Sequence, residues 1–328
     1  MLSDETGKPL ASWSGRDRIG DRILDSFTVI LKTGGCAWSR CRMCSYRHER
    51  FTGLSAQDLS SRLIEQLSYI RSHADLRKPE LVKIYTSGSF FDPGEVPHEV
   101  RSAAAALFRG KMIIAETRPE YVDAGVLEDF SSQIDDGTWE QPLSVAIGVE
   151  TSNDAIREKS IQKGFSWAQF LHAVHEARRA GAGVKGYLLM KPPFLTEKEA
   201  VQDMQRSIAD LSPQTHLISL NPCSVQRQTE LERLWKQGEY RPPYLWSILA
   251  VIRASPVHLT VDPLGGGSRR GPHNCGTCDT EILKAIRDYS LSGDRTLIEE
   301  ISRKECACKP EWDFVMEQEK PFCMPQTR

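Results

Sequence analysis

The segment 33-TGGCAWSRCRMCSYRH-48 decides how this chain is interpreted, because it holds three of the nine cysteines in 328 residues. Cys36, Cys41 and Cys44 follow a Gly-Gly pair, with four and then two residues between them. Tetrahedral sulfur sites belong to zinc or to iron–sulfur clusters. A [4Fe–4S] cluster held by three cysteines keeps one iron open for a cofactor or substrate, and we favour this interpretation. A zinc knuckle completed by His48, or three buried thiols, are the alternatives.

Composition narrows the class of protein. Hydrophobic residues make up 40% of the chain, and the net charge is only -2. The whole molecule is therefore not an electrostatic nucleic-acid binder, and any such surface must be local or supplied by a partner. The sequence has no apolar run of membrane length and no signal-peptide pattern. We expect a cytoplasmic protein without a membrane partner, in which thiols stay reduced.

Strand-like and helix-like segments alternate from about residue 27 onward. The helical segments between the strands begin with capping pairs such as Ser55 with Asp58, and Thr196 with Glu199. Six strand–helix units with short connections predict a parallel sheet covered by helices. The expected strands are 27–33, 81–86, 111–117, 142–150, 184–190 and 215–221.

A polar cluster follows each predicted strand, as in TSGSF (86–90) and ETRPE (116–120). A doubly wound sheet would give the same alternation, but barrel enzymes build their sites at the C-terminal ends of their strands. We therefore predict an α/β fold, a partial (β/α)6 TIM barrel with a small C-terminal metal-binding region. The expected domains are an N-terminal extension (1–26), the barrel (27–225) and the C-terminal region (226–328).

A cysteine triplet after the first strand of a partial barrel resembles the radical S-adenosylmethionine (SAM) superfamily. Most members space the triplet by three and then two residues, whereas four and then two separate it here, and Met43 replaces the usual aromatic residue. The motifs ETRPE and GVETSNDAIREKSIQKG resemble the Elongator-like branch. The resemblance implies a [4Fe–4S] cluster on Cys36, Cys41 and Cys44, a bound SAM, and radical chemistry that begins with SAM cleavage.

The resemblance also implies which residues bind SAM. Ser87, Gly88 and Ser89 stand where the superfamily has a glycine-rich turn for the SAM amino group, and such a turn lets the backbone approach a ligand. Glu116 with Arg118 resembles a ribose-side pair, and a cation near Glu150 would pair the SAM carboxylate. The candidates are Tyr46, Ser87, Gly88, Ser89, Glu116, Arg118, Glu150, Arg157, Lys163, Lys191 and Asn221. The alternatives are internal ion pairs for the two glutamates and solvated positions for Arg157 and Lys163.

A second cysteine group lies near the C-terminus. Cys275 and Cys278 form a Cys-x2-Cys pair, and Cys306 and Cys308 form a Cys-x-Cys pair. Four paired thiolates predict a structural zinc site. His273 is an alternative fourth ligand, because a Cys-x-Cys pair closes on one ion less readily, and an auxiliary iron–sulfur cluster is a further alternative. The single cysteines Cys223 and Cys323 are interpreted as a packed thiol and a residue without special function.

The loop GGGSRRGPH (265–273) carries Arg269 and Arg270 beside the predicted zinc site. Arginine matches phosphate oxygens, so these two residues are candidate nucleic-acid contacts. A solvated loop is the alternative interpretation.

Five phrases narrow the resemblance to the radical SAM enzymes of archaeosine synthesis: ILKTGGCAWSRCRMCSY, VAIGVETSND, LLMKPPFLTEKEA, YRPPYLWS and GSRRGPHNCGTCD. This family implies a lyase acting on archaeal tRNA, with a lysine-transferring subunit of archaeosine synthase as partner and a separate electron donor. The partner attaches lysine to a 7-cyano-7-deazaguanine base in the D-loop, and the radical enzyme cleaves the lysine C–N bond to give archaeosine. Another radical SAM enzyme modifying RNA or a small molecule, or a non-catalytic Fe–S or zinc protein that binds RNA or a partner, remain the alternatives.

Overall fold

The computed structural model describes residues 7–320 and has the partial-barrel α/β fold expected from the sequence. The chain divides into two compact units. The first contains the residues up to Ser39, Tyr46–Gly148 and Gln169–Lys185, and the second contains Arg40–Ser45, Val149–Ala168 and the residues from Gly186 onward. Cys323, to which we assigned no special function, lies outside the described residues.

The strands follow chain order, from β1 to β8, in one eight-stranded sheet. Their bounds are β1 Ala11–Ile19, β2 Arg22–Ile30, β3 Leu81–Tyr85, β4 Met112–Thr117, β5 Leu143–Glu150, β6 Gly183–Met190, β7 Leu217–Pro222 and β8 Thr260–Val261. The six expected strands correspond to β2–β7. Pairing is parallel from β2 to β5 and between β7 and β8, as strand–helix–strand units require.

The N-terminal extension contributes a strand of its own, which the sequence analysis did not predict. β1 pairs antiparallel with β2 along its whole length, from Ala11 opposite Ile30 to Ile19 opposite Arg22. A two-residue turn joins them, and its Gly20 has a φ of 58°, which glycine adopts without strain. β2 therefore begins five residues earlier than the predicted strand, because the hairpin partner supplies backbone hydrogen bonds to residues 22–26.

Each of β2–β7 is followed by a helix, as predicted. The helices are α1 Ala56–His73, α2 His98–Leu107, α3 Ala124–Ile134, α4 Trp167–Arg179, α5 Glu197–Leu211, α6 Glu230–Lys236, α7 Leu245–Ala254, α8 Asp279–Ser292, α9 Arg295–Ser302 and α10 Lys309–Gln318. Short helical segments are η1 Tyr46–His48, η2 Pro119–Tyr121 and the π-helix η3 Ile156–Ile161. Both predicted capping arrangements are present, at the starts of α1 and α5.

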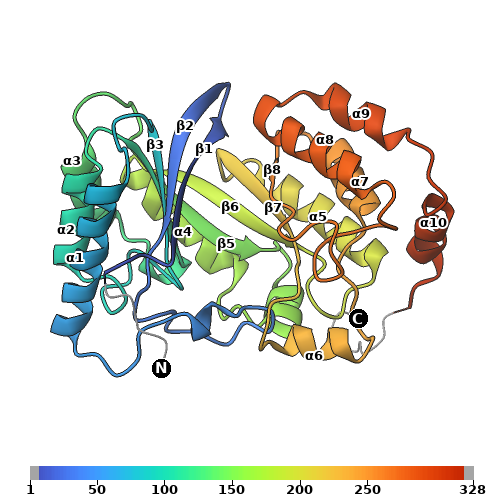
Figure 1. The fold of residues 1–328 in the computed structure, drawn as a ribbon, viewed down its shortest axis with the longest axis horizontal. Helices are drawn as coiled ribbons and strands as arrows, with labels where there is room; N and C mark the ends of the chain where they lie inside the picture. The colour runs from blue at the N-terminus through green and yellow to red at the C-terminus, as the bar shows by residue number, and fades with distance from the viewer. Residues whose placement is uncertain (1–6, 321–328) are drawn as a thin grey trace. The chain divides into compact units, whose positions relative to one another are not determined.

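The core of the first unit lies between its strands and its outer helices. Figure 1 shows α1, α2 and α3 side by side along these strands. The central strands are almost continuously buried, as expected for a sheet covered on both faces. Across residues 7–320, none of the helices has the length and apolar character that crossing a membrane requires.

Candidate active site and metal centre

The cysteine loop and the loop after β3 meet at Cys36 and Gly88, both in the first unit. A β-carbon on Gly88 would lie 2.6 Å from Cα of Cys36 and 2.8 Å from its Cβ. No side chain fits in that space, so only glycine lets these two backbones approach so closely. The first predicted cluster ligand therefore lies directly against the loop predicted to bind the SAM amino group.

Glu95 fastens the same two loops, and the sequence analysis did not identify it. The Thr33 hydroxyl donates to Oε1 of Glu95 at 2.6 Å, and the backbone N–H of Ser89 donates to Oε2 at 2.6 Å. Glu95 is only 1% exposed, and burial raises the pKa of its carboxyl group. The only sequence signal was an acidic residue after the Asp-Pro-Gly turn that follows TSGSF.

The ends of β3 and β4 meet through Ser89 and Arg118. The backbone N–H of Arg118 donates to Oγ of Ser89 at 3.0 Å. The Arg118 side chain is buried, donates to Glu120 at 2.5 Å, and its guanidinium lies 5.7 Å from the ring centre of Trp38 in the cysteine loop. Two predicted cofactor-binding residues are thus joined, and the partly buried Glu116 is the second-to-last residue of β4.

Cys41 and Cys44 belong to the second unit. Cys41 is buried and Cys44 is partly buried. Arg42, between them, fixes this part of the loop, because its backbone N–H donates to the carbonyl of Ile161 at 3.0 Å and its guanidinium pairs with Glu230 at 2.5 Å. These two contacts therefore fix the path of the second half of the cysteine loop.

Glu150 and Lys191, at the ends of β5 and β6, have positive φ values of 66° and 58°. Non-glycine residues adopt this conformation at a cost, and such positions cluster at functional sites. Both side chains are paired in the second unit: Lys163 lies 2.5 Å from Glu150, and Lys191 lies 2.7 Å from the buried Glu197. The charged residues predicted at these strand ends are therefore organised in ion pairs.

Arg157 lies in the π-helix η3 and has no exposed surface, so it is not the solvated side chain that we considered as an alternative. Its guanidinium donates to the carbonyl of Val149 at 3.1 Å, to the carbonyl of Thr151 and to the carboxylate of Asp154. Burial lowers the pKa of this guanidinium despite the neighbouring carboxylate. Arg157 therefore fastens the segment that leaves β5.

Two further candidates and one single cysteine differ in accessibility. Tyr46 is 43% exposed in η1, and Asn221 is partly buried near the end of β7. Cys223 is 1% exposed and packs with Leu231 and Tyr240, among others, which confirms the interpretation as a packed thiol.

Cys275, Cys278, Cys306 and Cys308 form a compact group in the second unit, with all four sulfur atoms within 4.8 Å of one another. Within residues 7–320, this is the one group of three or more such side chains close enough to share an ion. His273 lies outside the group, and its Nδ1 lies 2.8 Å from the carbonyl of Gly271. The geometry therefore brings together all four predicted cysteines without the alternative histidine.

The two neighbouring arginines have different environments. Arg269 is exposed. Arg270 donates to the carbonyl of Val225 at 3.1 Å, pairs with Glu232 at 2.6 Å, and stacks 4.9 Å from the ring centre of Trp235. Arg270 therefore braces its own loop, which leaves Arg269 as the more accessible candidate for phosphate.

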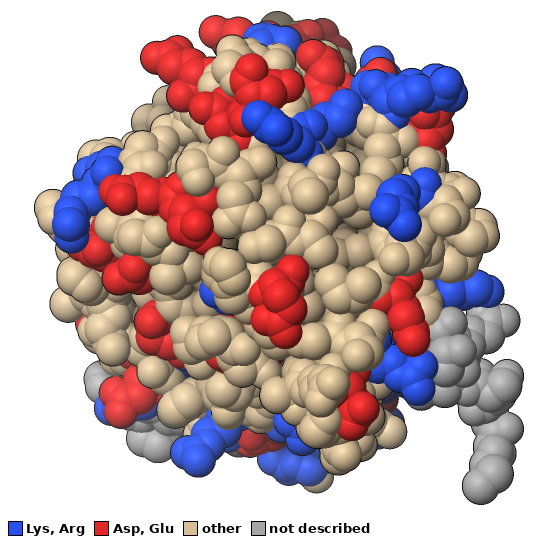
Figure 2. All heavy atoms as spheres, turned by 90° about the vertical axis from the view of Figure 1, so that its left-hand side faces the viewer, with Lys and Arg blue, Asp and Glu red and all other residues tan. Residues whose placement is uncertain are grey.

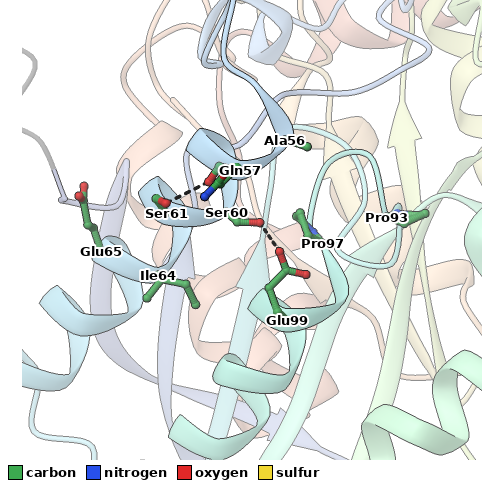
Figure 3. Close-up of a pocket in the computed structure, with 9 residues that line it drawn as sticks. All are labelled: Ala56, Gln57, Ser60, Ser61, Ile64, Glu65, Pro93, Pro97 and Glu99. Carbon is green, nitrogen blue, oxygen red and sulfur yellow. Dashed lines mark hydrogen bonds between the residues drawn. The ribbon is translucent and has the colours of Figure 1, made fainter.

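An open groove of about 770 Å³ lies on the outside of the first unit, between α1 and the start of α2. Figure 3 shows Ser60 hydrogen-bonded to Glu99 across it. Figure 2 shows acidic and basic side chains mixed on the face that carries α1, α2 and α3. The groove is lined by Ala56, Gln57, Ser60, Ser61, Ile64, Glu65, Pro93, Pro97 and Glu99, a set that includes none of the predicted site residues.

Comparison with known proteins identifies the family. Archaeosine synthase subunit beta of Methanosarcina acetivorans is 39% identical over 326 residues, covering 96% of this chain and 91% of that protein. The chain belongs to the archaeosine synthase subunit beta family. The family member from Thermococcus kodakarensis is 35% identical over 319 residues, covering 93% of this chain and 96% of that protein.

The chain was also compared with family models and with solved structures. No family model matches the sequence. Among solved structures, queuine lyase from Clostridium spiroforme aligns with 18% identity and a TM-score of 0.47, over 68% of this chain and 86% of that chain.

Proposed function

We propose that this member of the archaeosine synthase subunit beta family is a radical SAM lyase of tRNA modification. The substrate is a tRNA whose D-loop 7-cyano-7-deazaguanine base already carries lysine. The bond that breaks joins a lysine carbon to the nitrogen attached to the base, and that nitrogen stays behind as the formamidine of archaeosine. The nearly full-length match to two archaeosine synthase subunits beta carries this proposal.

The residues present suit the cofactors that this reaction needs. Cys36, Cys41 and Cys44 would hold a [4Fe–4S] cluster by three thiolates, and the absence of a side chain at Gly88 lets its loop lie directly against Cys36. When bound, the cluster and SAM together supply a 5′-deoxyadenosyl radical that removes hydrogen from the substrate. The radical chemistry itself belongs to these cofactors.

The role of the protein's own residues is to bind SAM and to orient it toward the substrate. In this proposal, Ser87, Gly88 and Ser89 present backbone groups to the SAM amino group, held in place by Glu95. Other strand-end residues surround the rest of SAM: Tyr46, Glu116, Arg118, Glu150, Lys163, Lys191 and Asn221. Arg157 acts from inside the fold by fixing the β5 connection, because its donors are already engaged. Close positioning of the lysine carbon is the main rate contribution expected of the protein.

Two observations support a lysine-transferring subunit as partner: the near-zero net charge of the chain, and the description of its relatives as a subunit beta. A chain with a net charge of -2 has little general attraction for RNA, so the lysine-transferring subunit would supply most phosphate contacts. Arg269 is the proposed local contact to tRNA phosphate. An electron donor from the cytoplasm, where we place the protein, would provide the reducing electron.

An isotope experiment tests the C–N cleavage. The lysine-bearing tRNA would be made with ¹⁵N at the nitrogen that joins lysine to the base, and incubated with reconstituted protein, SAM and reductant without oxygen. The proposal predicts archaeosine that carries the label in its formamidine. SAM cleavage with unlabelled or no archaeosine would favour another radical SAM reaction. Intact SAM, despite a full cluster, would favour a non-catalytic Fe–S or RNA-binding protein.

A further inference from the structure

We infer that Cys275, Cys278, Cys306 and Cys308 bind a single tetrahedral zinc ion, and that this ion holds helix α10 in place. The inference does not depend on which tRNA reaction the protein catalyses. It rests on the spacing of the four sulfur atoms, on the groups around them and on the composition of α10.

The spacing of the sulfur atoms favours one ion over a cluster. Cys275 and Cys306 are 3.6 Å apart, Cys278 and Cys308 are 3.7 Å apart, and Cys306 and Cys308 are 3.5 Å apart. Four thiolates at ~2.3 Å from one zinc ion lie ~3.8 Å from one another. The cysteines of a [4Fe–4S] cluster bind four different irons, which separates their sulfur atoms to roughly 6 Å. Disulfides would need ~2.05 Å.

Buried N–H groups surround the thiols as they do in metal sites. Nε1 of Trp246 donates to Sγ of Cys308 at 3.3 Å, and Nδ2 of Asn274 donates to Sγ of Cys278 at 3.3 Å. The other end of the Asn274 amide accepts from the backbone N–H of Leu245 at 2.8 Å, which links the site to the start of α7. Donors of this kind stabilise thiolate charge and orient the ligands.

The two helices next to the site begin at its ligands. Cys278 immediately precedes α8, and Cys308 immediately precedes α10. The partial positive charge of each helix start faces the thiolates, which offsets part of the negative charge of a Zn(Cys)4 centre.

Helix α10 is held by polar contacts rather than by a buried apolar face. None of its ten residues, Lys309–Gln318, is buried, and Phe314 is 66% exposed. Isolated helices of this length are marginal in water. Its side chains make polar contacts with the residues around it. Glu311 accepts from Tyr244 at 3.0 Å, and Trp312 donates to Ser247 at 2.8 Å. Nζ of Lys309 donates to the carbonyl of Ser302 at 2.9 Å and lies 5.4 Å from the ring centre of Trp246. A metal at Cys306 and Cys308 would add a stronger anchor at the start of the helix.

The position of α10 also affects the end of β6. Glu319, the residue after α10, accepts from the backbone N–H of Glu197 at 2.6 Å and lies 3.8 Å from Nζ of Lys191. Glu197 is the partner of Lys191, a predicted site residue with strained backbone. The ion therefore connects, through α10, to the ion-paired group at a strand end of the barrel.

Metal analysis of paired variants tests the identity of the ion. The full chain would be produced and purified without oxygen, and zinc and iron measured per chain. We expect Cys36→Ala to keep about one zinc and lose iron, and Cys278→Ala to lose zinc and keep iron. Loss of iron in Cys278→Ala, or retention of zinc, would overturn the inference.

Two further measurements test the inference even if Cys278→Ala fails to fold. Cobalt replacing zinc in the wild-type chain should give the intense visible bands of a tetrahedral tetrathiolate site, and an octahedral spectrum would contradict the geometry. Hydrogen exchange in α10 should accelerate by about tenfold or more in Cys306→Ala but not in Glu305→Ala, its exposed neighbour. Unchanged exchange in α10 after zinc loss would refute the anchoring role.

Discussion

The α-carbon of Cys36 lies only 2.6 Å from the point that a β-carbon on Gly88 would occupy. This relationship joins the loop of the cysteine triplet to the loop after β3. It explains why residue 88 of that loop is a glycine. Any side chain at residue 88 must push the two loops apart.

Replacing Gly88 should therefore disable the site. We predict that Gly88→Ala displaces Cys36 and lowers SAM cleavage by about a hundredfold or more, since small misplacements of reacting groups are that costly. Gly125→Ala is the matched control. Gly125 lies in α3, and a β-carbon there would be 3.4 Å from its nearest atom, Oδ1 of Asp123, which is an ordinary contact. Iron content and 5′-deoxyadenosine formation measure the effect. Equal activity of the two variants would refute the close approach.

Glu95→Gln tests whether the buried carboxylate holds the two loops together. The amide keeps the shape but loses one acceptor, so either Thr33 or Ser89 loses its partner at a cost of about 1–3 kcal/mol. We predict a higher KM for SAM and lower cluster occupancy. Glu99→Gln, on the exposed side of α2, should leave both unchanged. A Glu95→Gln protein with normal KM and iron content would show that the bridge is dispensable.

Arg157→Met should destabilise the second unit rather than alter the charge at its surface. The change removes the donors of two backbone carbonyls and leaves them buried, which we expect to lower the free energy of unfolding by about 3–5 kcal/mol. Lys159→Met, at an exposed position of η3, is the control. Thermal and urea unfolding provide the measurement, and similar stabilities of the two variants would contradict a structural role.

The buried carboxyl group of Asp203 should make the free energy of unfolding depend on pH. It accepts from the Thr151 hydroxyl at 2.8 Å, but its buried Oδ2 has no hydrogen-bond partner in the described structure. Burial raises the pKa of this carboxyl from 3.8 to about 6. Because the folded-state pKa is raised, ionisation opposes folding, and the free energy of unfolding should fall as pH rises from about 4 to 6.

Asp203→Asn should remove that fall. We expect the variant to match the wild type near pH 4 and to exceed its stability by about 2 kcal/mol at pH 8. Urea unfolding at both pH values measures the difference. A variant that is less stable than the wild type at pH 8 would mean that the ionised carboxylate has a partner that the geometry does not provide.

Most of the fold could be predicted because its signals are local. Six apolar strands alternate with helices whose starts carry capping residues; five of the strands lie within two residues of their expected positions, and β2 begins five residues early. The missed strand, β1, is mostly exposed, so it lacks the apolar run that marks buried strands. Its signal was the turn at Gly20 between two β-forming segments, which indicates a hairpin.

The candidate site was less accessible to sequence reasoning. Cysteine spacing identified the Cys275 group, because metal ligands must lie close together and recur in pairs. Glu95 and Glu197 could not be found in this way, because buried acceptors are defined by partners distant in the chain. Arg270 was predicted as a phosphate contact, and its pairing with Glu232 could not be read from the sequence.

The most direct test of the central claim is the formation of 5′-deoxyadenosine by the reconstituted, reduced protein with SAM. It would be measured without oxygen, with lysine-bearing tRNA and with the same tRNA before lysine transfer. We predict that 5′-deoxyadenosine formation rises strongly with the lysine-bearing tRNA and is accompanied by archaeosine. Formation that does not respond to lysine on the tRNA, or none at all from a protein with a full cluster, would contradict it.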